Sequence, residues 1–178
     1  ANRLGNLVAD IIQLSRLDEQ QDAVVSMESV ELDELAKDVV NNLRDHAEKK
    51  NISLDYCGIP INIQGVRHVL YEMLYNIADN AVRYTNPGGH IHIYVGRKGD
   101  HPFYRVEDDG IGIPKSEQKR IFERFYRVDK SRARAQGGAG LGLALCEKIA
   151  VLHQGRITFE STLGQGTTVT VSLEGGRP

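Results

Sequence analysis

The chain has 178 residues and a formal net charge of −2, which suits one compact domain with a short additional element. Apolar residues make up 40% and charged residues 26%, as in an ordinary globular protein. Its two cysteines form no C-x-x-C pair and no Cys/His set at metal spacing, so we expect reduced thiols in a cytosolic protein. The small negative net charge does not favour nucleic-acid binding. The sequence has no apolar run of about 18 residues, so direct membrane contact is not expected.

Residues 1–20 predict a helix with a narrow apolar seam. Its apolar residues step by three, four and three positions: Leu4, Leu7, Ile11 and Leu14. A seam of this kind needs a partner, and no second heptad segment follows. The helix is therefore interpreted as half of a hairpin or bundle, with docking on its own domain as the alternative. The polar stretch 18–24 is interpreted as a linker.

The rest of the chain alternates helical and strand patterns. Apolar periodicity predicts helices at 32–51, 66–83 and 141–153, the last ended by Gly155 as C-cap. Strands are predicted at 24–30 and 52–56, and two hairpins pair 90–98 with 102–108 and 156–162 with 167–173. This order predicts an α+β fold with helices on one face of a sheet. Residues 175–178 are predicted to be a disordered tail.

Two asparagines on the second predicted helix are candidates for a ligand site. Asn76 and Asn80 are one turn apart, and Asn80 projects to the edge of the apolar face. A buried amide must find hydrogen bonds or a ligand, and amide oxygens are suitable ligands for Mg²⁺. Considered alone, the pair is a weak signal that capping or sheet contacts explain better than a ligand does.

The stretch "VEDDGIGIP" (106–114) combines carboxylates with glycines at the end of a predicted strand. Gly110 and Gly112 allow close backbone approach by a flat or bulky group. The Asp108 carboxylate beside that gap can accept a hydrogen bond from an exocyclic amine, so it is suited to a base rather than a phosphate. A glycine-containing turn with a capping aspartate is the structural alternative.

A third candidate combines a glycine-rich run with a basic aromatic segment. Four glycines lead into the last predicted helix: Gly137, Gly138, Gly140 and Gly142. Backbone N–H groups at a helix start favour an anion, although an unliganded hinge is possible. No Lys-Ser/Thr follows, which excludes a P-loop. The preceding segment carries aromatics and basic residues that favour a lid reaching phosphates: Phe122, Phe125, Tyr126, Arg127, Lys130, Arg132 and Arg134.

Taken together, these motifs resemble the ATP-binding domain of sensor histidine kinases, within the group that includes the gyrase, Hsp90 and MutL ATPases. "NIADNAVRYT" looks like the N box, "EDDGIGI" the G1 box, "IFERFYRVDKSR" the F box, "GGAGLGLAL" the G2 box and "GQGTTVTV" the last glycine motif. The resemblance implies a Bergerat-type two-layer α/β sandwich, a mixed sheet with three helices on one face. It also implies a catalytic domain at 21–174, with 1–20 similar to the second helix of the dimerisation and phosphoacceptor domain.

The resemblance assigns ATP and Mg²⁺ as cofactors and a role to each matching residue. Asp108, Gly112 and Thr167 would form the base pocket, with Tyr84 along the adenine. Asn80 would hold Mg²⁺ and Asn76 would lie beside the phosphates. The further residues of the implied nucleotide site are Arg83, Gly110, Ile113, Tyr126, Arg127, Gly138, Gly140, Leu141, Gly142 and Leu143. Of these, Arg83 and Arg127 would neutralise phosphate charge, and Asn76, Asn80 and Arg127 form the implied catalytic set.

Asn76 distinguishes between reaction classes within the resemblance. Gyrase-like ATPases carry at that position a glutamate that activates water, and an amide cannot take that proton. Phosphoryl transfer to a protein group is therefore favoured. The six histidines are 46, 68, 90, 92, 101 and 153, and none matches a phosphoacceptor, so the acceptor helix is expected outside this chain. A gyrase-type ATPase, an anti-sigma-type serine kinase and a non-catalytic nucleotide-binding module remain alternatives.

The implied partners are the phosphoacceptor helix of the same kinase and the receiver domain of a response regulator. The parent protein would be a homodimer anchored in a bacterial membrane, and this chain would be a cytoplasmic, monomeric fragment of it. One departure concerns the start of the second predicted helix. Family members often carry Gly-Asp there, whereas this chain has Gly65-Val66, so a carboxylate at the helix start is missing and local stability is in question.

Overall fold

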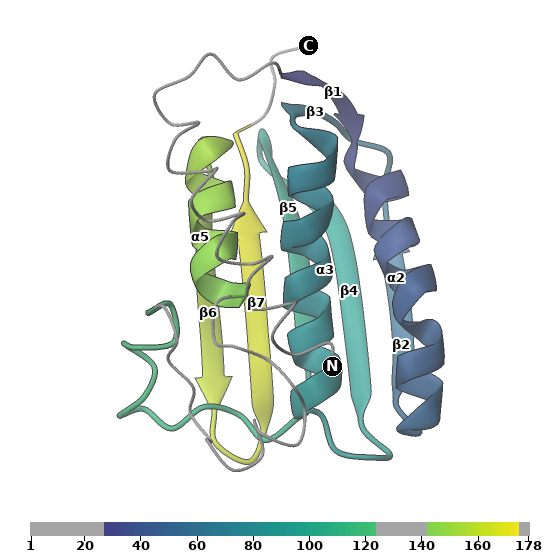
Figure 1. Ribbon diagram of the computed structural model, residues 1–178, viewed down its shortest axis with the longest axis vertical. Helices are drawn as coiled ribbons and strands as arrows, with labels where there is room; N and C mark the ends of the chain where they lie inside the picture. The colour runs from purple at the N-terminus through teal and green to yellow at the C-terminus, as the bar shows by residue number, and fades with distance from the viewer. Residues whose placement is uncertain (1–26, 124–141, 175–178) are drawn as a thin grey trace, which may run out of the picture.

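The computed structural model describes residues 27–123 and 142–174, and its elements keep the labels of Figure 1. A five-stranded sheet has the order β2-β4-β5-β7-β6. Its strands are β2 (Ser53–Gly58), β4 (His90–Lys98), β5 (His101–Asp108), β6 (Arg156–Thr162) and β7 (Gly166–Ser172). β2 and β4 are parallel and the other pairs antiparallel, so the sheet is mixed, as the family resemblance implies.

Three helices cover one face of this sheet (Figure 1). They are α2 (Leu32–Lys49), α3 (Arg67–Tyr84) and α5 (Gly142–Leu152). β1 (Glu28–Glu31) and β3 (Asn62–Gly65) form a separate antiparallel pair beside α2. The predicted two-layer sandwich with three helices on one face is therefore confirmed.

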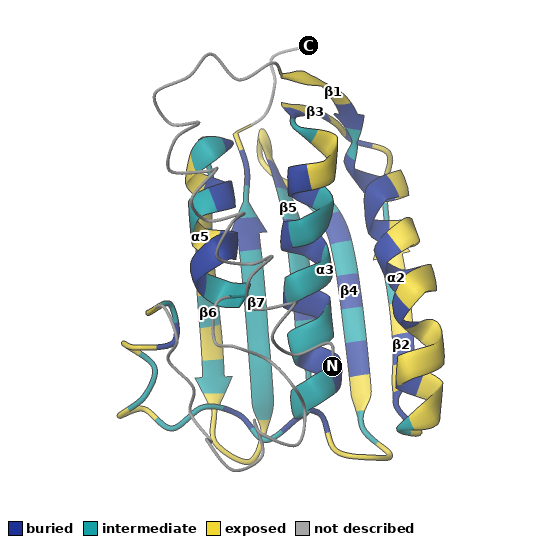
Figure 2. Cartoon of the chain, in the orientation of Figure 1, coloured by how far each residue is buried: buried dark blue, intermediate teal, exposed yellow. Residues whose placement is uncertain are grey.

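The core lies between the sheet and the helices, where both elements present their apolar side chains. The buried face of β4 carries Ile91, Ile93 and Val95, and that of β5 carries Tyr104 and Val106, following the two-residue period of a strand. Figure 2 shows the buried positions of α2 and α3 on the sides turned toward the sheet. The Tyr104 hydroxyl donates to the carbonyl of Leu74 at 2.9 Å, which fastens the sheet to α3.

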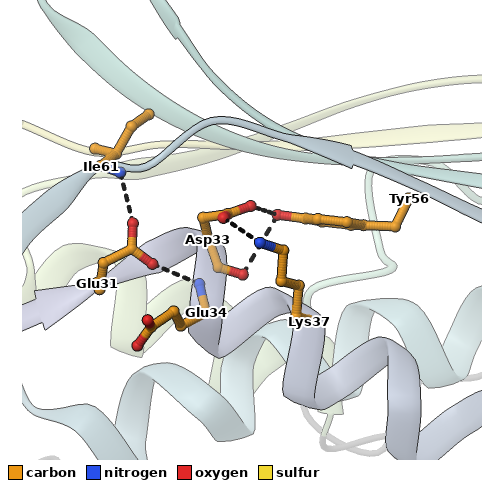
Figure 3. Close-up of polar contacts among 6 residues, drawn as sticks. All are labelled: Glu31, Asp33, Glu34, Lys37, Tyr56 and Ile61. Atoms are coloured by element: carbon orange, nitrogen blue, oxygen red, sulfur yellow. Dashed lines mark hydrogen bonds and ion pairs between the residues drawn. The ribbon is translucent and has the colours of Figure 1, made fainter.

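Polar contacts fix the start of α2 (Figure 3). The Glu31 carboxylate caps the helix and accepts the Ile61 N–H at 2.8 Å. Asp33 is buried but accepts hydrogen bonds from the Tyr56 hydroxyl and from Lys37 Nζ, the latter at 2.7 Å. Burial raises the pKa of Asp33, but these two bonds and the positive charge of Lys37 together lower it by more, so the net pKa lies below 3.8. The buried carboxylate is therefore satisfied as an anion.

The structure corrects three details of the predicted elements. Strand β3 was not expected. The first described strand begins at Glu28 instead of residue 24, and residues 24–26 lie outside the described part. The left-handed residue after α5 is Gln154, with φ of 56°, and not the predicted Gly155. Gly155 is still required, because a Cβ there would lie 2.5 Å from the Ser172 carbonyl oxygen while its N–H bonds the Ala150 carbonyl at 2.7 Å.

A histidine from a different helix contacts the backbone at the start of α3. Val66 has no side-chain cap, and the first turn of α3 carries no acidic residue. His153, 7% exposed at the end of α5, accepts the Val66 N–H at Nε2 (3.1 Å) and donates from Nδ1 to the Ile149 carbonyl (2.7 Å). These partners define a neutral tautomer. His153 thus satisfies the Val66 N–H from a different helix, whereas a carboxylate at position 66 would accept an N–H of the first turn of α3.

This arrangement predicts a pH-dependent contribution of His153 to stability. Burial lowers the pKa of His153 below its ordinary value of 6.5, so the unfolded chain binds the proton more readily. The stabilisation is present above pH 6.5 and is lost as the pH falls from 6.5 through the folded-state pKa. We expect His153→Gln to lower the free energy of unfolding by about 1–3 kcal/mol at pH 7.5, and the difference from the parent to shrink at pH 5.

Urea unfolding of parent and variant at both pH values measures this difference. His46→Gln, at an exposed position of α2, is the matched control and should show no such change. A gap between parent and His153→Gln that stays constant with pH would contradict the neutral role of His153.

Candidate nucleotide-binding site

The site is built around Asp108 at the end of β5. Asp108 continues the row of Tyr104 and Val106 that faces the helices. Its Oδ1 accepts the N–H groups of Gly110 (2.9 Å) and Thr167 (3.3 Å). Burial raises the pKa of Asp108 above 3.8, and these two bonds lower it by less. The result is a partly buried carboxylate held in a fixed orientation by backbone.

Two glycines after Asp108 let the turn pass close to neighbouring backbone. A Cβ on Gly110 would lie 2.3 Å from the Tyr84 carbonyl oxygen. Gly112 has φ of 69°, and a Cβ there would lie 2.1 Å from the Thr162 carbonyl oxygen. From the sequence we expect a ligand to lie against these two glycines. In the structure, backbone carbonyl groups of the protein occupy the positions that their Cβ atoms would take. The glycines therefore bring Asp108, the end of α3 and the β6–β7 hairpin together.

A hydrogen-bond network joins the turn after β5 to the β6–β7 hairpin. Ser161 Oγ accepts the Ile113 N–H at 2.8 Å, donates to the Gly166 carbonyl at 3.1 Å and contacts Thr167 Oγ1 at 2.8 Å. Gln118 Nε2 donates to the carbonyls of Ile113 (3.0 Å) and Ser161 (3.1 Å). Sequence reasoning missed Ser161 and Gln118. The predicted hairpin, with its loop at 163–166, would place Thr162 opposite Thr167, whereas the structure pairs Ser161 with Thr167, so the sequence carried no signal for Ser161.

The asparagines and the start of α5 form the other end of the site. Asn76 and Asn80 are both partly buried on α3, and a Cβ on Gly142 would lie 3.8 Å from Asn76 Oδ1. α3 and α5 lie side by side (Figure 1). Leu143, also partly buried, follows in the first turn of α5. The amide of Asn76 thus faces the beginning of the helix that sequence reasoning assigned to phosphate.

Arg83 has a partner that the sequence hypothesis did not include. Its Nε forms an ion pair with Asp79 Oδ2, one turn earlier on α3, at 2.9 Å. Asp79 engages the Nε edge of the guanidinium, and the planar group has four further N–H donors. Arg83 can therefore keep this ion pair and still offer donors to an anion.

Several predicted site residues fall outside the described part of the chain. They are the glycine-run residues Gly137, Gly138, Gly140 and Leu141, and the predicted lid residues Phe125, Tyr126, Arg127, Lys130, Arg132 and Arg134. The same holds for the predicted helix at 1–20 and the tail at 175–178. Within residues 27–123 and 142–174, no three or more His, Cys, Asp and Glu side chains gather as a metal site would require. No described helix combines the length and apolar character needed to cross a membrane.

The two ends of the site suit different parts of one ligand. Tyr84 and Asp108 lie at one end, and Asn76 lies about 12 Å away along α3, at 1.5 Å per residue. The Asp108 end offers a fixed acceptor, whereas the Asn76 end offers amide groups and a helix start, where the helix dipole favours an anion. A ligand with a donor-bearing base and a string of phosphates fits this polarity. The fold and site together define a nucleotide-binding α/β sandwich.

Comparison with known proteins identifies the family. The model described as "Histidine kinase-, DNA gyrase B-, and HSP90-like ATPase" matches residues 65–177. The circadian input-output histidine kinase CikA of Synechococcus elongatus is 38% identical over 93% of this chain and 22% of its own length. The sensor-like histidine kinase SenX3 of Mycobacterium tuberculosis is 37% identical over 97% of this chain and 42% of its own. This chain therefore spans less than half the length of either curated relative.

Solved structures agree with the sequence relatives. Full-length ShkA in complex with AMPPNP superposes with a TM-score of 0.82 at 26% identity, covering 99% of this chain and 37% of ShkA. The mycobacterial sensor histidine kinase MprB gives a TM-score of 0.74 at 26% identity, covering 86% of this chain and 99% of that structure. The chain belongs to the histidine kinase, DNA gyrase B and HSP90-like ATPase family, as an ATP-binding catalytic domain of the sensor histidine kinase type.

Proposed function

We propose that this domain binds Mg-ATP along α3, between the end of β5 and the start of α5. It would transfer the γ-phosphoryl group to a histidine on a dimerisation helix outside this chain, for relay to a response-regulator aspartate. The observation that carries the proposal is the Asp108 carboxylate, oriented by the N–H groups of Gly110 and Thr167. It would accept a hydrogen bond from the adenine amino group, with Tyr84 and Ile113 around the base.

Magnesium is included because the donor set fits it. Mg²⁺ in phosphoryl-transfer sites keeps several waters and needs few protein ligands besides the phosphates. The amide oxygen of Asn80 would be the protein ligand here, with the phosphates and waters supplying the remaining positions. The ion would neutralise phosphate charge. Asn76, Arg83 and Arg127 would orient and neutralise the phosphates beside it.

Asn76 supports transfer to protein over hydrolysis. An amide cannot accept a proton from water, and Asn76 Oδ1 lies beside the start of α5, where phosphates are expected. Positioning and charge neutralisation then supply the catalysis, and the acceptor must come from elsewhere. A gyrase-type reaction would need a base that this position lacks.

The partners follow from the reaction class. The domain would act on the phosphoacceptor helix of its own parent protein, and a receiver domain would take the phosphoryl group from that histidine. We infer a homodimeric parent anchored in a bacterial membrane, with this domain on the cytoplasmic side. Support comes from the relatives, which are named sensor histidine kinases.

Supplying the acceptor in trans tests the reaction. The domain is incubated with γ-labelled ATP and Mg²⁺, with or without the dimerisation segment of the parent protein as a separate polypeptide. We expect acid-labile label on that segment only, and none on this chain alone. The matched control is the same segment with its acceptor histidine replaced by alanine. Steady phosphate release without the segment would favour a hydrolysing ATPase, and acid-stable label would favour a serine kinase.

A further inference from the structure

Ser161 sits at the centre of the contacts that orient Thr167. Its Oγ lies 2.8 Å from the Ile113 nitrogen, 3.1 Å from the Gly166 carbonyl oxygen and 2.8 Å from Thr167 Oγ1. A serine hydroxyl has one proton to donate and two lone pairs that accept. Three polar neighbours therefore use its full capacity.

The chemistry of the neighbours decides where each proton goes. The Ile113 N–H can only donate, so it takes one lone pair of Ser161 Oγ. The Gly166 carbonyl can only accept, so it takes the single Ser161 proton. The remaining lone pair faces Thr167 Oγ1, and all three contacts are satisfied only when Thr167 is the donor. The Thr167 proton is thereby committed to Ser161, and its oxygen keeps only acceptor capacity.

Thr167 lies directly beside Asp108, the proposed acceptor for the base. Thr167 and Asp108 are partners in the β5–β7 pairing, and the Thr167 N–H donates to Asp108 Oδ1. An ionised carboxylate only accepts hydrogen bonds. The two side chains therefore offer acceptors alone at this end of the site. Such an edge complements an amino group and opposes a carbonyl oxygen.

We propose that Ser161 is a positioning residue for base specificity, which holds the Thr167 hydroxyl as an acceptor and so selects a 6-aminopurine over a 6-oxopurine nucleotide. This inference rests on the proposed ATP site and deepens it. A 6-oxo group would face acceptors with no proton between them, and unpaired polar groups in a partly buried site lower affinity. Without the Ser161 hydroxyl, the Thr167 hydroxyl would be free to rotate and to donate its proton to a 6-oxo group.

Calorimetric titration with ATP and with inosine triphosphate tests the proposal, since the latter carries a 6-oxo group in place of the 6-amino group. We expect the parent to favour ATP, and Ser161→Ala to reduce the ratio of the two affinities about tenfold. Thr158→Ala is the matched control, because Thr158 is exposed on the same strand β6 and alternation places it on the opposite face from Ser161. It should leave the ratio unchanged. An unchanged ratio in folded Ser161→Ala overturns the proposal.

A second variant keeps the test decisive if Ser161→Ala does not fold. Thr167→Val removes the hydroxyl, so it should weaken ATP more than inosine triphosphate if that hydroxyl is an acceptor. If Thr167→Val instead weakened inosine triphosphate more than ATP, the Thr167 hydroxyl would be a donor and the inference would be overturned. Asp108→Asn separates this outcome from a failure of the proposed function. ATP binding that does not depend on Asp108 refutes the site itself, whereas dependence on Asp108 with a ratio insensitive to Ser161 refutes only the role of Ser161.

Discussion

Asp108→Asn should abolish measurable ATP binding and leave the folded domain at least as stable as the parent. The carboxylate is the acceptor proposed for the adenine amino group, and an amide would place a donor or a weaker acceptor there. We expect an affinity loss of at least about 100-fold, because a hydrogen bond to a charged group is lost and a polar group of the base is left unpaired. Calorimetry with ATP measures the loss.

The stability half of this prediction follows from the pKa of Asp108. Burial raises it above 3.8, so between 3.8 and the raised value the folded state binds more protons than the unfolded chain. Stability therefore falls as the pH rises through that window, and the ionised carboxylate is unfavourable to folding at neutral pH. Asparagine removes that charge. Urea unfolding at pH 7.5 should give a free energy for Asp108→Asn that equals or exceeds the parent value.

The neighbouring residue provides the control for Asp108. Asp109 is exposed, and its carboxylate accepts the His90 N–H at 2.7 Å and contacts His90 Nδ1 at 3.0 Å. Asp109→Asn changes the charge by the same amount one residue away and should retain ATP binding. Unchanged affinity in Asp108→Asn, or equal losses in both variants, would refute a specific contact between Asp108 and the base.

Periodicity was sufficient to predict the main elements of the fold. Apolar residues recur with the helical period around Leu43 and Ile77, and they alternate with polar residues around Ile93 and Val106. The patterns are strong because each element presents one face to a single core. β3 was missed because four residues next to Pro60 carry almost no pattern. It exists as a strand because β1 pairs with it, and that partner lies about thirty residues earlier in the chain.

Some residues of the proposed site can be recognised from short motifs, whereas others depend on partners far away in the sequence. Asp108 and the asparagines could be proposed from sequence because their chemistry is visible in short motifs. Ser161 and His153 could not, since their roles depend on Ile113, 48 residues away, and Val66, 87 residues away. The purpose of Gly110 and Gly112 was also inaccessible to sequence reasoning. A glycine permits close approach, but only the fold shows which atom approaches.

Gly166→Ala should disrupt both the fold and nucleotide binding, because the space beside Gly166 is occupied by the backbone that carries Asp108. Gly166 has φ of 128°, and a Cβ there would lie 2.0 Å from the Asp108 carbonyl oxygen and 2.8 Å from Asp109 Cα. Left-handed strain and overpacking together should lower the free energy of unfolding by about 2–5 kcal/mol. Relief of the clash requires Asp108 to move, so ATP affinity should fall with it.

Gly164→Ala separates steric overlap from backbone strain, since Gly164 lies in the same β6–β7 turn. It has φ of 78°, but no atom lies within 4 Å of the position that a Cβ would take there. Only the conformational penalty of about 1–2 kcal/mol applies, and Asp108 is not displaced. Urea unfolding and ATP calorimetry on the two variants should therefore show a small stability loss with retained binding for Gly164→Ala. Equal effects on ATP affinity would mean that Gly166 serves the turn alone and that Asp108 is positioned by other contacts.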